Sequence, residues 1–143
     1  MSGEIEVSWV GKLVELMKET ENLDGRVYLL KIIRAMSTSA TITRFIQYEG
    51  LQILSDWITE HEGNNELENL TYILSALVNV DFPLESIRLY NIRDKIKNLT
   101  NHVTTRVADL SRTILSKWES ASKAEPPKTS QHAQPSKVAV SYV

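Results

Sequence analysis

The stretch from Val103 to Trp118 constrains the fold of this chain most, because it has the apolar spacing of one helical face. Its apolar residues recur every three or four positions: Val103, Val107, Leu110, Ile114, Leu115 and Trp118. We expect the helix to end at the tryptophan, whose large side chain would close a helical bundle.

The segment after this helix has a different composition. Residues 123–143 carry Pro126, Pro127 and Pro135 among small polar residues, and they offer too little apolar area to offset the entropy of ordering. The sequence therefore predicts one helical domain over residues 1–122 and a disordered Pro/Ser/Gln-rich linker over residues 123–143.

The same helical period recurs upstream, and no stretch alternates with the period of a strand. We expect Trp9 to pack at the start of the first helix, Asp24 and Thr41 to cap later helices, and Gly50 to supply a left-handed turn. The predicted helices cover 6–18, 26–36, 41–49, 51–63, 65–78 and 84–99, the last as one helix or two. This pattern predicts an all-α fold, a compact right-handed bundle or short superhelical stack of about six to eight helices.

Composition excludes several classes of protein. The chain is 42% hydrophobic and 24% charged, and no apolar run approaches the roughly 20 residues of a membrane span. It has no cysteine, which excludes disulfides and thiolate nucleophiles. Glu4 and Glu6 lie where a secretory signal would be positively charged, so we expect an intracellular protein.

Charge is unevenly distributed along the chain. Residues 1–85 hold 6 basic and 14 acidic side chains, whereas residues 86–118 hold 7 basic and 2 acidic ones. The basic residues of this second region either form a solvated surface or contact an acidic partner: Arg88, Arg93, Lys95, Lys97, Arg106, Arg112 and Lys117. Duplex DNA is the weaker expectation, because the chain as a whole has a net charge of −2.

No group of residues points to catalysis, a metal or a cofactor. His61 and His102 read as solvated residues near helix ends, and neither they nor His132 have ligands at metal-site spacing. The glycines do not cluster into a phosphate-binding loop. Glu15 and Glu19 are four residues apart, but they lie on the polar side of the first helix, where nothing would shift a pKa. The sequence therefore predicts a protein that is not an enzyme.

The tryptophans fall on or beside apolar stripes, so we interpret them as core residues rather than as a ligand cage. The predicted structural core comprises Leu54, Trp57, Leu74, Leu77, Leu110, Ile114, Leu115 and Trp118. Two motifs within this set are Gly50-x3-Leu54-x2-Trp57 and Leu110-Ser111-x2-Ile114-Leu115-x2-Trp118. In this order and spacing, over residues 8–120, they resemble the TFIIS N-terminal domain family, also called the LW domain.

This resemblance implies a non-catalytic, monomeric docking domain of nuclear regulators of RNA polymerase II elongation or termination, which binds short disordered acidic and aromatic motifs. Within the family, Tyr28 to Ile58 is similar to modules of phosphatase 1 nuclear-targeting subunits and of elongation-associated histone-lysine methyltransferases. The first likeness implies protein phosphatase 1 as a partner of a longer parent chain. Residues 137–140 resemble the short peptide through which proteins dock to protein phosphatase 1. The match is poor, because Val140 replaces an aromatic residue. The alternatives are a nucleic-acid-binding helical domain and an accessory domain of a histone-lysine methyltransferase.

Overall fold

The computed structural model describes residues 2–124, with side chains from 8 to 123. Within this range there are eight helices and no strand, which confirms the predicted all-α class. The helices are α1 (Ser2–Glu19), α2 (Leu23–Arg34), α3 (Ser39–Gln47), α4 (Gly50–Gly63), α5 (Leu67–Asn79), α6 (Leu84–Leu89), α7 (Ile92–Leu99) and α8 (Thr105–Ala124). No described helix combines the length and apolarity that a membrane span requires. The predicted linker begins at residue 123, but residues 123 and 124 belong to α8; the rest of it, with His132 and the 137–140 match, lies outside the described residues.

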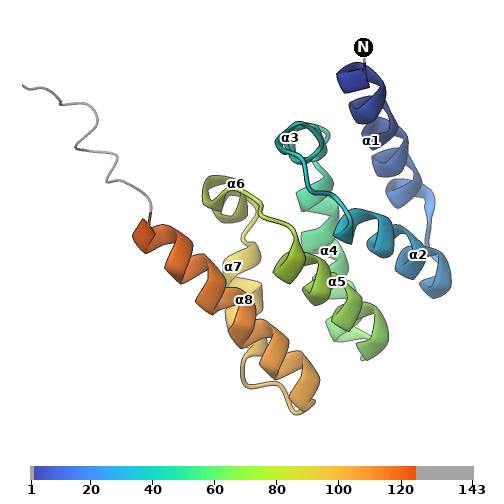
Figure 1. The fold of residues 1–143 in the computed structure, drawn as a ribbon. Helices are drawn as coiled ribbons and strands as arrows, with labels where there is room; N and C mark the ends of the chain where they lie inside the picture. The colour runs from blue at the N-terminus through green and yellow to red at the C-terminus, as the bar shows by residue number, and fades with distance from the viewer. Residues whose placement is uncertain (1, 125–143) are drawn as a thin grey trace, which may run out of the picture.

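Six of the described helices form two rows. Helices α2, α5 and α8 lie side by side in one row, and α1, α4 and α7 follow one another in the second (Figure 1). Helices α3 and α6 lie along one edge of these rows, α3 against α1 and α4, and α6 against α7 and α8 (Figure 1). Most of the packing is between helices that are not consecutive in the chain, such as α2 with α5 and α5 with α8.

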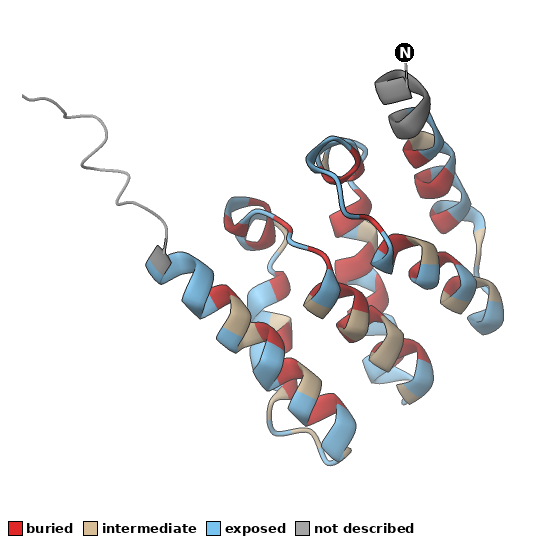
Figure 2. Cartoon of the chain, in the orientation of Figure 1, coloured by how far each residue is buried: buried red, intermediate tan, exposed pale blue. Residues whose placement is uncertain are grey.

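Helix α5 lies at the centre of the core. Leu70, Ile73, Leu74 and Leu77 are completely buried, and α2, α4 and α8 pack against this helix, along which buried residues are red in Figure 2. Burial of each such side chain contributes about 1.5 to 3 kcal/mol, so packing rather than helix propensity holds this layer together.

Two helix caps lie a few residues before the predicted ones. The side chain of Asn22 accepts a hydrogen bond from the Gly25 N–H at 2.6 Å, and that of Thr38 accepts one from Thr41 at 3.2 Å. Both residues have extended backbone angles, which lets the side chain fold back over the first turn. The predicted capping roles of Asp24 and Thr41 are therefore wrong, since both already lie within the first turn of their helices.

The turn between α3 and α4 also differs from the prediction. Glu49, not Gly50, adopts the left-handed conformation, with φ of 67°. Gly50 begins α4 and is needed for space, because a Cβ atom there would lie 2.4 Å from the Phe45 ring. The glycine therefore allows close packing rather than an unusual backbone angle.

The last helix and the first tryptophan correct further expectations. Helix α8 begins at Thr105 and continues six residues past Trp118, because no helix breaker follows the tryptophan before Pro126. Val103 precedes the helix and is 95% exposed. Trp9 is 38% exposed, so its indole is only partly packed against the fold.

Candidate functional site

Three of the seven predicted partner-binding residues make contacts within the fold. Lys95 on α7 donates from Nζ to the carbonyl oxygen of Ser55 at 2.9 Å and to its hydroxyl at 2.7 Å. Arg112 on α8 donates to Asp109 and to the Thr100 carbonyl, both at 2.9 Å. A partner that bound Lys95 or Arg112 would first have to displace these contacts.

Lys117 completes the end of a neighbouring helix. Its ammonium lies 3.0 Å from the Asp81 carboxylate and donates hydrogen bonds to three backbone carbonyls, those of Leu77, Val78 and Val80. The last carbonyls of a helix have no partner within the helix, and a cation at this end also interacts favourably with the helix dipole. Lys117 therefore joins α8 to the carboxyl end of α5.

The remaining four predicted residues are exposed: Arg88 on α6, Arg93 and Lys97 on α7, and Arg106 on α8. Within residues 8–123, none of their side chains forms a salt bridge or a hydrogen bond. Their charges are consequently available to a ligand.

Two of these free cations line a cavity of about 580 Å³ between α6, the start of α7 and the end of α8. Its apolar lining comes from Leu84, Ile87 and Trp118, which the same helices bury in the core. The tryptophan is only 3% exposed, so it forms part of the cavity wall. We call this site the α6–α8 pocket.

The backbone between α6 and α7 brings the two cations together. Asn91 adopts the left-handed conformation with φ of 60°, which asparagine tolerates better than most residues, and it separates the two helices. This turn places Arg88 and Arg93 at one pocket although they belong to different helices. Sequence reasoning that allowed one continuous helix from 84 to 99 did not predict this convergence.

The charges around the α6–α8 pocket are mixed. Arg88, Arg93 and Lys123 line it together with the carboxylates of Asp94 and Glu119. Among the described residues, the pocket therefore has three positive and two negative groups, although the chain carries a net charge of −2. An acidic ligand would be favoured next to the arginines and disfavoured next to the two carboxylates.

The other predicted residues lie elsewhere. Lys97 and Arg106 do not line the pocket. Of the eight predicted core residues, Leu110 and Leu115 are partly buried and pack against the core, and the other six are buried: Leu54, Trp57, Leu74, Leu77, Ile114 and Trp118.

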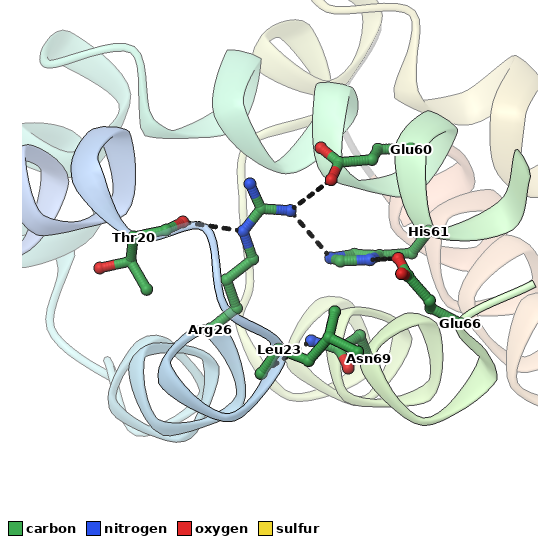
Figure 3. Close-up of polar contacts among 7 residues, drawn as sticks. All are labelled: Thr20, Leu23, Arg26, Glu60, His61, Glu66 and Asn69. Carbon is green, nitrogen blue, oxygen red and sulfur yellow. Dashed lines mark hydrogen bonds and ion pairs between the residues drawn. The ribbon is translucent and has the colours of Figure 1, made fainter. Parts of the chain in front are cut away.

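A buried polar cluster that the sequence did not predict joins α2 to α4 (Figure 3). Nη1 of Arg26 lies 3.1 Å from the Glu60 carboxylate and 3.3 Å from Nε2 of His61, and its Nε donates to the Thr20 carbonyl at 2.9 Å. The guanidinium also lies 4.6 Å from the centre of the Trp57 ring, a cation–π distance. The cluster therefore fixes the two helices to each other.

His61 is completely buried, so its prediction as a solvated residue is wrong. An arginine N–H can only donate, which makes Nε2 of His61 the acceptor and places the ring proton on Nδ1. Nδ1 then donates to Glu66 at 2.8 Å. Two positions gave a signal in the sequence: His61 lies seven residues after Leu54, and Arg26 lies seven before Ile33, on the apolar face of each helix.

Glu60, His61 and Glu66 bring three possible metal ligands within 4.8 Å of one another, an arrangement that the sequence spacing did not predict. The guanidinium of Arg26 already supplies a positive charge to two of them. A metal ion would have to displace this arginine.

The two carboxylates considered as catalytic acids, Glu15 and Glu19, are exposed on α1, and Glu15 is 3.8 Å from Lys12.

The described residues thus form an all-helical domain with one cavity that exposed arginines line. A comparison with models of known protein families gives no match. The chain is nevertheless distantly similar to serine/threonine-protein phosphatase 1 regulatory subunit 10, at 25% identity over 118 residues in the mouse and rat proteins and 24% in the pig protein. Each match covers 81% of this chain but only 13% or 14% of the relative. The name of these relatives describes a regulatory subunit.

Proposed function

We propose that this chain is a non-catalytic protein-interaction domain of a nuclear regulator of RNA polymerase II elongation or termination, acting in assembly with protein phosphatase 1. The distant similarity to a phosphatase 1 regulatory subunit covers most of the helical domain and supports this assignment. The resemblance of the two leucine/tryptophan motifs to the LW domain family supports the link to transcription.

The α6–α8 pocket is the proposed docking site, and its combination of apolar wall and free cations is the observation that carries the proposal. An aromatic side chain of the ligand would enter beside Leu84, Ile87 and Trp118. Acidic residues next to this anchor would reach Arg88 and Arg93, which have no salt bridge to any described residue. Such a ligand becomes ordered only on binding, so the affinity is modest.

A peptide with several acidic residues before one phenylalanine tests the site by isothermal titration calorimetry. We expect the double variant Arg88→Glu/Arg93→Glu to weaken binding about tenfold or more, because each reversal replaces an attraction with a repulsion. Lys97→Glu is the matched control, since Lys97 is exposed on α7 but does not line the pocket. An equal loss of affinity in both variants would place the peptide contact outside the pocket. No loss of affinity in either variant would reject the α6–α8 pocket as the docking site.

Nucleic acid is the second candidate ligand, because Arg88, Arg93, Lys97 and Arg106 are all exposed with no salt bridge among the described residues. Titration with single- and double-stranded oligonucleotides at two salt concentrations distinguishes it from a peptide. Binding to phosphates must fall steeply with salt, and Lys97→Glu would then weaken binding as well.

A further inference from the structure

A second hollow, which we call the aromatic groove, lies between α1 and α2 and has a volume of about 530 Å³. It is lined by Trp9, Tyr28, Lys31, Ile32 and Ala35. The two aromatic side chains are large and exposed, Trp9 by 38% and Tyr28 by 67%. Exposed tryptophan and tyrosine on the walls of one hollow are typical of a binding surface, because each combines apolar area with a polar group.

Lys31 gives this groove a positive charge. Its ammonium lies 5.7 Å from the centre of the Tyr72 ring on α5, so an aromatic contact helps to hold the cation in place. No described carboxylate pairs with it, although residues 1–85 hold 14 acidic and 6 basic side chains. Arg34, one turn further along α2, is exposed and likewise has no salt bridge to a described residue. Lys31 is thus a cation on the groove itself, and Arg34 is a second one on the next turn of α2, in an otherwise acidic part of the chain.

We propose that the aromatic groove docks a proline-rich, extended segment of a partner protein that carries acidic side chains next to its prolines. Proline rings pack against exposed aromatic side chains, and a polyproline II segment loses little conformational entropy because it is already extended. Ile32 and Ala35 supply aliphatic contacts between the rings, and Lys31 pairs with the carboxylate. The complementary charge selects acidic over basic proline-rich segments.

The aromatic groove and the α6–α8 pocket are separate surfaces. They share no lining residue, and α1 and α2 lie at the opposite end of the two rows from α6 and α8 (Figure 1). The inference therefore goes beyond the proposed function, and each site can be rejected without the other.

The test uses the full 143-residue chain and a synthetic peptide in which two glutamates precede a Pro-Leu-Pro-Pro-Leu-Pro segment. We expect amide chemical-shift changes concentrated in α1 and α2, and an affinity that calorimetry measures in the micromolar range or weaker. A control peptide with every proline replaced by alanine should bind about tenfold more weakly, because it lacks the preformed extended conformation.

Variants of the chain identify the groove. Tyr28→Ala should weaken binding about tenfold, and Lys31→Glu about fivefold, since one removes a stacking surface and the other reverses the paired charge. Both side chains are exposed, so circular dichroism should show an unchanged fold. Leu89→Ala and Arg44→Glu are matched controls, because each alters an exposed side chain outside the groove and should leave the affinity unchanged.

Several results would overturn the proposal. Absence of binding would do so, as would equal binding of the alanine peptide or unchanged affinity of both groove variants. Concentration-dependent self-association that Tyr28→Ala abolishes would instead assign the groove to a second copy of the chain. Loss of binding in Arg88→Glu with full binding in Tyr28→Ala would place the peptide in the α6–α8 pocket.

Discussion

Replacement of Arg26 by methionine tests whether the buried cluster stabilises the fold. Methionine retains much of the aliphatic volume but removes every hydrogen bond of the guanidinium. Glu60 is half exposed and can be rehydrated, whereas the acceptor Nε2 of His61, completely buried, loses its donor, and the Thr20 carbonyl loses another. Loss of a charged hydrogen bond costs about 1.5 to 3 kcal/mol, and broken buried pairs reach about 3 to 5 kcal/mol.

We therefore expect Arg26→Met to lower the free energy of unfolding by about 3 kcal/mol. This value is at the lower end of the range for a broken buried pair, because Glu60 regains water. Urea denaturation followed by circular dichroism measures this loss. With a slope of about 1.5 kcal/mol per M, the midpoint should fall by about 2 M. A long-range proton–nitrogen spectrum should also show the ring proton of His61 on Nδ1 in the wild type.

Arg34→Met is the matched control, since Arg34 lies on the same helix but is exposed and has no salt bridge to a described residue. Its free energy of unfolding should change by no more than about 0.5 kcal/mol. Arg26→Lys should give an intermediate loss, because one ammonium cannot reproduce the planar set of donors. If Arg26→Met unfolds at the same urea concentration as Arg34→Met, the cluster contributes nothing to stability and the reasoning is refuted.

Three further substitutions probe other parts of the fold, each by urea denaturation. Trp118→Ala should cost about 3 to 5 kcal/mol, as truncation of a buried aromatic does, and a near-native midpoint would contradict its role in the core. Lys117→Met should cost about 1 to 3 kcal/mol, because three carbonyls at the end of α5 lose their donor, and Lys123→Met serves as the exposed control. Asn22→Ala should cost about 1 kcal/mol through loss of the α2 cap, whereas Asn22→Gly should cost only a few tenths.

The repeated apolar spacing predicted the helical class and most helix positions correctly. The spacing determines which face of a helix can be buried, and this depends only on local sequence. The helix ends were less predictable, since Asn22 and Asp24 are both good capping residues. The backbone angles of the folded chain decided between them.

The candidate site could be predicted only in part. The sequence showed a concentration of basic residues after position 85, but not that Lys95 and Lys117 are held by carbonyls 37 to 40 residues away. Nor did it show that the left-handed Asn91 directs Arg88 and Arg93 to one pocket. Residue type gives a charge, but the availability of that charge depends on the distant groups that surround it.

The sequence alone determined that this chain forms helices with an apolar face and that its basic residues gather late in the domain. Tertiary structure decided which polar side chains became part of the core. Arg26 and His61 are 35 residues apart and tolerate burial because each satisfies the other's hydrogen-bonding group. Burial of a polar group depends on a partner in space, and a one-dimensional pattern does not contain that partner's position.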